Sequence, residues 1–274
     1  MTIDAKIIRD SVNVATGDRL TTLEVTMPRI VLAEFNTHRL LSRNSASSRA
    51  IPVDKTILAI QHDPFLPIFW GLNQAGMQAQ AELSAEKLDL ARREWLAARD
   101  AAIASAKALL AIGLHKQIAN RILEPWMYTT VIVSATEWVN FFKLRCHPAA
   151  QPEMRRTAEA MRDAMAASSP QKLQPGDWHI PMAGQADDAI MSHETKLKVA
   201  TAHLARVSYL THDGVRDIDK DVELHDRLAA SGHWSPFEHC ARAADMLGQV
   251  KPSNFRGWIQ YRKFFPGEDG ISRV

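Results

Sequence analysis

The stretch from Gln78 to Ile112 contains no proline or glycine, and it constrains the fold of this chain more than any other feature. It is rich in Ala, Glu, Arg and Leu, which have high helix propensity, and Gly113 follows it as a typical helix stop. The sequence therefore predicts one long helix here. We expect its apolar face to pack into the core or against another subunit. That face carries Leu88, Ala91, Trp95, Ala98, Ala102 and Leu109.

Residues 1–36 are predicted to form β-structure. Alternating and β-branched positions occur at 12–14 and 20–26, and Gly17-Asp18 between them suits a hairpin turn. Met27-Pro28 interrupts the pairing, after which a strand-like apolar run resumes at residues 30–32. A later run of apolar and β-branched residues ends at Val133 and predicts another strand.

Further helices are predicted in the second half of the chain. Ser134-Ala135-Thr136-Glu137 has the form of a capping box, ahead of a helix that ends by His147-Pro148. Another helix is expected from about Pro152, with methionines at helical spacing as a core stripe. Residues 53–75 and 168–190 are expected to be irregular, and 194–230 to be helical with a break near 212–214.

Composition excludes several classes of protein. The chain has 33 basic and 31 acidic residues, so no global field points to nucleic acid or to a membrane. No apolar run reaches the roughly 18 residues of a membrane span, and the N-terminus lacks a signal-peptide core. Cys146 and Cys240 make no disulfide framework, so a reducing cytoplasm is expected. Cys146-His147 has no second pair at zinc spacing, and no metal site is expected.

The stretch from Glu34 to Arg49 is the strongest candidate for a functional site. Guanidinium forks, hydroxyls and backbone N–H groups gathered in one loop suit an oxyanion such as a phosphate. The same composition is also typical of a solvated loop, because Ser and Asn are common turn residues. The polar members are His38, Arg39, Ser42, Arg43, Asn44, Ser45, Ser47, Ser48 and Arg49.

Several other catalytic patterns do not occur. There is no Gly-x-Gly-x-x-Gly to indicate a Rossmann nucleotide fold, no Gly-x-Ser-x-Gly elbow and no His-Glu-x-x-His. Ser42 and Ser47 could suggest a nucleophile, but a serine needs an activating base and the arginines of the loop cannot act as one. We interpret these serines as hydrogen-bond donors.

The order of residues in this loop resembles the signature of the flavin-dependent thymidylate synthases, Arg-His-Arg-x-x-Ser-x-Asn-Glu-x-Ser-x-Arg-Tyr. The positions that match are His38, Arg39, Ser42, Asn44, Ser47 and Arg49. Those that depart are Thr37 for the first Arg, Ser45 for Glu and Ala50 for Tyr. Because most of the signature is kept, the loop is similar to the nucleotide and flavin loop of that family.

A second block also resembles the family. Arg121 precedes a proline-containing strand, Asn140 to Arg145 match Asn-x-x-x-Leu-Arg, and Ala150 to Glu153 match Ala-Gln-x-Glu. The resemblance implies that Arg121 holds the nucleotide phosphate, that Asn140 lies at the flavin and that Arg145 faces the pyrimidine and favours its ionisation. A guanidinium suits that last role, although an arginine here could equally cap a helix C-terminus. Ala149 replaces a family histidine on the flavin side.

A third block lies near the C-terminus. Residues 205–209, Ala-Arg-Val-Ser-Tyr, and 232–239, Gly-His-Trp-Ser-Pro-Phe-Glu-His, resemble segments that help to hold the flavin in the family. There they precede the arginine-histidine loop, whereas here they follow it, so the motif order resembles a circular permutation. We therefore expect one domain over residues 1–274, with the family's N-terminal flavin-binding block placed at about 195–263.

The resemblance implies an α+β fold, with a small antiparallel sheet packed with long helices, and a homotetramer with shared active sites. It implies transfer of a one-carbon unit from methylenetetrahydrofolate to C5 of a deoxyuridine monophosphate, with FAD as cofactor and NADPH as reductant. Arg145 is the expected catalytic residue. The cofactor-binding residues implied are Thr37, His38, Arg39, Ser45, Asn140, Ser208, His233, Ser235 and Glu238. The substrate-binding residues implied are Glu34, Ser47, Ser48, Arg49, Arg121 and Arg145.

The departures from the signature leave the substrate open. Glu34 stands where the family has a glutamine near the nucleotide, and a carboxylate there suits an exocyclic amine better than a phosphate. Methyl or hydroxymethyl transfer to another pyrimidine nucleotide such as dCMP is therefore an alternative. A catalytically silent relative that binds a nucleotide or RNA is a further one.

Overall fold

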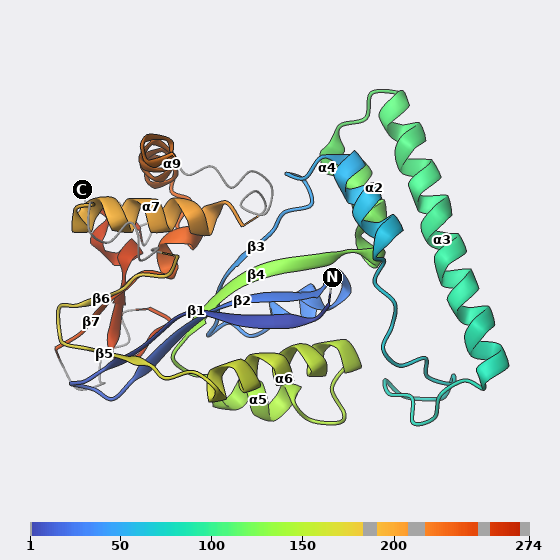
Figure 1. Cartoon of the computed structure of the whole chain (residues 1–274), viewed down its shortest axis with the longest axis horizontal. Coiled ribbons are helices and arrows are strands. Elements are labelled where there is room, and N and C mark those ends of the chain that lie inside the picture. The colour runs from blue at the N-terminus through green and yellow to red at the C-terminus, as the bar shows by residue number, and fades with distance from the viewer. Residues whose placement is uncertain (1, 183–190, 208–216, 246–252, 269–274) are drawn as a thin grey trace.

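The computed structural model describes residues 2–182, 191–207, 217–245 and 253–268. Its centre is a five-stranded sheet in the order β3-β4-β2-β1-β5, with helices on both faces (Figure 1). The strands are β1 (Asp4–Asn13), β2 (Arg19–Pro28), β3 (Ser42–Ser45), β4 (Tyr128–Ala135) and β5 (Gln171–Leu173). Neighbours pair antiparallel, except that β5 runs parallel to β1.

The predicted N-terminal hairpin is confirmed. β1 and β2 pair antiparallel across a turn in which Gly17 has a φ of +74°, a conformation that glycine adopts without strain. Pro28 ends β2 opposite Tyr128, and no strand resumes after it. The chain turns instead into η1 (Arg29–Val31) and α1 (Leu32–Phe35), so the predicted strand at 30–32 is wrong. One helical turn there buries both Val31 and Phe35 in the core.

The side chains of β4 alternate between two cores and show how the sheet is covered. Val131 and Val133 pack in one cluster with residues of α5 (Val139–Arg145) and α6 (Pro152–Ala166). Ile132 points to the opposite face and packs with residues of α7 (His193–Ala205). A strand buried on both faces reads as a continuous apolar run, as this one does.

A helical region packs at the start of β4 (Figure 1). It comprises α2 (Val53–His62), α3 (Ala85–Ala111), α4 (Lys116–Ala119) and η2 (Asn120–Trp126). The predicted long helix is confirmed as α3, although it begins at Ala85, after Ser84, rather than near Gln78. The prediction that residues 53–75 are irregular is wrong for α2, which buries Ile57 and Ile60 against Ile103 of α3.

The C-terminal part adds α9 (Ile218–Ala230), η3 (Ser235–Glu238) and η4 (Tyr261–Phe264) beside a second sheet. That sheet has the order β6-β7-β8, formed by β6 (Trp178–His179), β7 (Ala241–Ala243) and β8 (Trp258–Gln260). The expected helices within 194–230 are confirmed as α7 and α9. The segment 168–190 was expected to be irregular, but β5 and β6 lie within it because short edge pairings carry little sequence signal.

The capping box predicted at Ser134 is wrong. Ser134 lies inside β4, and its buried hydroxyl contacts Thr22 at 2.6 Å and His239 at 2.8 Å. Helix α5 begins later, at Val139, with Trp138 as its N-cap residue. The tertiary partners of Ser134 outweigh the local capping signal. The helix predicted from Pro152 is confirmed as α6.

The fold class is α+β, as expected, with the parallel β1–β5 pair as an addition to the antiparallel sheet. Within the described ranges, none of the helices has the length and apolar character needed to cross a bilayer. The ends of β3, β4 and α5 then position the polar residues singled out in the sequence.

Candidate active site

The polar stretch 34–49 is divided by the fold into three parts. Its beginning leaves α1 through a tight turn, in which the Thr37 hydroxyl donates to the Glu34 carbonyl at 2.7 Å. Its middle is not a loop, because Ser42–Ser45 is strand β3 on the edge of β4. Its end approaches η2, where Asn120 donates to the Ser48 carbonyl at 2.6 Å. Each part therefore presents its side chains to a different neighbour.

The first part meets Arg145 at the C-terminal end of α5. The Nε–H of Arg145 donates to His38 Nε2 at 2.7 Å, and its Nη1 donates to the Glu34 carboxylate. Nη2 lies 3.5 Å from the Thr37 hydroxyl. Residues that are 107 to 111 positions apart in the chain thus form one cluster around a single guanidinium. Arg145 does not act merely as a helix C-cap, because its donors reach side chains of the loop.

His38 is neutral in this cluster. Burial lowers the pKa of His38, and the nearby charges of Arg145 and Arg43 lower it further. Because Arg145 donates to Nε2, the remaining proton of the neutral ring lies on Nδ1. The ring also packs edge-on against Phe141, with centroids 4.9 Å apart. His38 therefore fixes the orientation of Arg145 without adding charge.

Arg145 and Glu34 line a cavity of about 590 Å³. Its other walls come from residues 69–79 and from the turn between α5 and α6, including Pro148, Ala149 and Gln151. A cavity of this volume can hold a flat ring. The cluster presents guanidinium donors and one carboxylate acceptor to that space.

The set expected to bind phosphate lies elsewhere, around Glu124 of η2. The buried Ser48 hydroxyl donates to the Glu124 carboxylate at 2.6 Å, and Arg121 donates to the same oxygen at 2.8 Å. Arg29 adds a third donor at 3.2 Å. Arg49 is exposed and makes no hydrogen bond or ion pair with the described residues. Ser47 belongs to the same turn and is half-buried.

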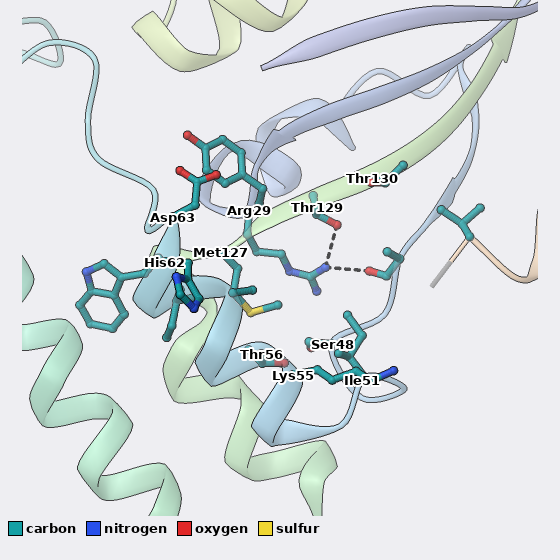
Figure 2. Close-up of a pocket in the computed structure, with 16 residues that line it drawn as sticks. Arg29, Ser48, Ile51, Lys55, Thr56, His62, Asp63, Met127, Thr129 and Thr130 are labelled. Carbon is teal, nitrogen blue, oxygen red and sulfur yellow. Dashed lines mark hydrogen bonds between the residues drawn. The ribbon is translucent and has the colours of Figure 1, made fainter. Parts of the chain in front are cut away.

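A second cavity, of about 400 Å³, opens beside this set between α2 and the start of β4. Figure 2 shows Arg29 reaching across it toward Thr129, with Ser48 and Lys55 on another wall. The guanidinium of Arg29 donates to the Ala46 carbonyl at 2.9 Å and lies 3.3 Å from the Thr129 hydroxyl. The two cavities share no lining residue.

Part of the expected flavin set gathers along β3. The Asn44 side chain donates to the Leu204 carbonyl and accepts from Ser235 at 3.2 Å, so the third block contacts the arginine-histidine loop. Glu238 pairs with Arg262. Ser45 ends β3 beside these contacts and is half-buried.

Other members of the flavin set are exposed. His233 contacts the Ser231 hydroxyl at 2.9 Å, while Arg39 and Asn140 make no hydrogen bond or ion pair with the described residues. Ser208 lies outside the described residues. The exposed donors are chemically suited to the phosphates and ring edge of a flavin nucleotide, but in one chain they lie on separate elements.

Sequence reasoning missed several residues that the structure places in the site. Arg29 and Glu124 lie far apart in the chain, and only the fold brings them together at Ser48. Gln260 donates to the Ser42 hydroxyl at 2.9 Å and so ties β8 to β3. A carboxylate three residues after Arg121 was the one available signal, because that spacing forms ion pairs on a helix.

A metal centre finds no support in the described part of the chain. There, no three or more His, Cys, Asp or Glu side chains gather as a group that could hold an ion. Cys146 is half-buried and Cys240 is buried, and burial raises the pKa of both thiols.

Comparison with known proteins gives the family. The family described as Thymidylate synthase complementing protein, Thy1, matches residues 20–171, which is more than half of the chain. The chain belongs to this family, and the resemblance drawn from the sequence is confirmed. No curated protein matches the sequence at a significant level.

The solved structures that are similar to this chain include two of one protein. One is a UMP/dUMP methylase, PolB, from Streptomyces cacaoi bound with 5-Br dUMP, with 21% identity, a TM-score of 0.45, and coverage of 54% of this chain and 67% of that one. The other is the same protein bound with 5-Br UMP, with 17% identity, a TM-score of 0.48, and coverage of 60% and 89%.

Proposed function

We propose that this protein transfers a one-carbon unit to C5 of a pyrimidine deoxynucleotide monophosphate, with dUMP as the first candidate. Methylenetetrahydrofolate is the proposed donor, FAD the cofactor and NADPH the reductant. The observation that carries the proposal is the Arg145 guanidinium, held by His38 and Glu34 at a cavity of about 590 Å³ in a chain of the thymidylate synthase complementing family.

Arg145 is proposed to activate the base. Two parallel N–H donors on a planar fork match the edge of a pyrimidine and stabilise negative charge that develops on it. The Nε–H of the Arg145 guanidinium donates to His38, which fixes the orientation of the group and leaves its Nη atoms toward the ligand. Reduced FAD, when bound, supplies hydride to this chemistry.

The phosphate is proposed to bind at the turn that carries Ser47, Ser48 and Arg49, with Arg121 alongside. Charge-assisted hydrogen bonds of this kind are each worth about 1.5–3 kcal/mol. Arg121 forms an ion pair with Glu124 in this structure, so a bound phosphate would compete with the Glu124 carboxylate for the N–H donors of Arg121. Ser48 of this set lines the cavity of about 400 Å³, whereas Arg145 and Glu34 line the cavity of about 590 Å³, and the two cavities share no lining residue. We infer that a nucleotide that touches both sets lies between two copies of the chain, in line with the homotetramer with shared sites that the family resemblance implies.

The flavin is proposed to bind along β3 and its neighbours. Thr37, His38, Arg39 and Ser45 would contact it from the loop and Asn140 from α5. From the third block we assign His233, Ser235 and Glu238, and Ser208 by resemblance alone. The contacts of Asn44 with Leu204 and Ser235 support the view that residues 195–263 replace the family's N-terminal flavin block within one domain.

A cytosine nucleotide is the second candidate, and the Glu34–Arg145 ion pair favours it. Cytosine presents two acceptors, O2 and N3, beside an amino donor. Arg145 can donate to both acceptors while Glu34 accepts from the amino group, since an ionised carboxylate only accepts. Uracil has a carbonyl in place of that amino group, so it would use fewer of these contacts.

Turnover and flavin binding test the proposal together. Wild-type protein should bind FAD saturably, and His233→Ala should bind it more weakly. Conversion of dUMP or dCMP should be slower in Arg145→Ala and unchanged in Lys143→Ala, because Lys143 is an exposed cation on the same helix that lines neither cavity. Colourless protein with no saturable FAD uptake would instead support a silent nucleotide- or RNA-binding relative.

A further inference from the structure

Residues 65–83 form a segment that is held by hydrogen bonds and that lines one side of the Arg145 cavity. The backbone N–H of Ile68 donates to the buried carboxylate of Glu153 at 2.8 Å, and Gln78 donates to the Ala149 carbonyl. Within the segment, Leu72 pairs with Ala81 at 2.7 Å and Leu83 with Trp70 at 3.0 Å. These bonds hold the segment against the N-terminal end of α6.

Gly71 lets the two arms of this segment approach each other. A Cβ atom at Gly71 would overlap the Cβ of Ala79 and crowd the Phe69 ring at 3.2 Å. The close approach places Phe69, Met77 and Ala79 along the cavity wall. The wall is therefore a built feature of the fold rather than a loose loop.

A third cavity, of about 410 Å³, adjoins the Arg145 cavity along this wall. The two share the lining residues Phe69, Ala79, Pro148, Ala150 and Pro152. Together they make a groove that runs from Arg145 and Glu34 to the first turns of α6. Its middle is apolar, with an aromatic ring and two prolines, which suits a flat aromatic group.

The far end of the groove carries Arg155, Arg156 and Glu159. Arg155 donates to Glu159 at 2.8 Å, so these two charges neutralise each other. Arg156 is exposed and has no ion pair with the described residues. The end of the groove therefore offers one available guanidinium beside one carboxylate.

We propose that this groove binds the aminobenzoyl-glutamate part of the folate donor, with Arg156 holding a glutamate carboxylate. The inference rests on the proposed function, since it assigns the donor of that reaction to a place. A guanidinium binds a single carboxylate through two parallel hydrogen bonds. A phosphate dianion fits less well, because it would need a second cation and Arg155 is already paired with Glu159.

Isothermal titration calorimetry with folate tests this assignment on the FAD-loaded protein. Arg156→Gln should raise the Kd for folate about three- to tenfold, as expected for a charged contact near the surface. Arg162→Gln is the matched control, because Arg162 is exposed on the same helix and lines none of these cavities. Folate dimethyl ester should bind wild type and Arg156→Gln equally.

Two outcomes would overturn the inference. One is an unchanged Kd for folate in Arg156→Gln. The other is that Arg156→Gln binds dUMP more weakly than wild type does but binds deoxyuridine equally well. That result would place the nucleotide phosphate, rather than a folate carboxylate, beside Arg156. The proposed function is tested by a separate experiment, in which it fails if wild-type protein forms no nucleotide product. The calorimetry is independent of that result, because it measures folate binding without turnover.

Discussion

Two buried histidines make the stability of this protein depend on pH. His179 contacts Ser11 at 2.9 Å and Thr22 at 2.8 Å, and the chain of contacts continues through Ser134 to Nδ1 of His239 at 2.8 Å. This buried network joins the central sheet to the C-terminal segment. Burial lowers the pKa of His239 to about 3 and holds the pKa of His179 well below its usual value.

The sign and size of the effect follow from these pKa values. The folded protein keeps His239 neutral, while the unfolded chain takes up a proton below its ordinary pKa of 6.5. Neutral His239 therefore makes its whole contribution to the free energy of unfolding above pH 6.5. That contribution is lost as the pH falls from 6.5 toward about 3. Between pH 7 and pH 5, His239 alone should lower it by about 2 kcal/mol, and His179 acts in the same direction.

Urea unfolding at pH 7 and pH 5, followed by tryptophan fluorescence, measures this difference. In His239→Asn the side chain can still meet Ser134 but does not titrate, so the loss of stability between the two pH values should be about 2 kcal/mol smaller than in wild type. His62→Asn is the control for the substitution itself, because His62 is exposed and lies outside this hydrogen-bond network. An equal loss in His239→Asn and wild type would refute the reasoning.

Three further substitutions test the site. Arg145→Ala should lower kcat/KM roughly ten- to hundredfold. It should lower kcat more than it weakens nucleotide binding, because the contact of Arg145 strengthens as the ring ionises. An effect on KM alone would contradict this. Glu34→Gln should shift the ratio of dUMP to dCMP turnover toward dUMP, and an unchanged ratio would show that Glu34 does not face the base. Gly71→Ala should destabilise the protein by about 1–3 kcal/mol, because its Cβ meets Ala79; an unchanged melting temperature would show that the segment yields.

Sequence reasoning succeeded where local signals and tertiary structure agree. The hairpin has a glycine at its turn, and α3 has high helix propensity throughout, so both were predictable. Helix α2 was missed because the prolines at 64 and 67 dominated the composition of its neighbourhood, although the helix ends before them. Ser134 was misassigned because its partners, Thr22 and His239, are far away in the chain.

The site shows the same division. His38 and Arg145 could be chosen from the sequence by resemblance, yet their hydrogen bond could not, since 107 positions separate them. The ion pair between Glu34 and Arg145 was likewise not predictable, since 111 positions separate the two residues. Arg29 carried no motif at all, and only the packing of η1 against η2 brings its guanidinium to Glu124.

Transfer of a labelled carbon tests the central claim most directly. Purified protein with FAD, NADPH and dUMP would be supplied with methylenetetrahydrofolate that carries ¹³C in the methylene group, and the nucleotides separated and weighed by mass spectrometry. The proposed function predicts a deoxynucleotide with the heavy carbon in a group at C5, formed from dUMP or, in a parallel reaction, from dCMP. Unlabelled and unchanged nucleotides in both reactions, from protein that has bound FAD, would contradict it.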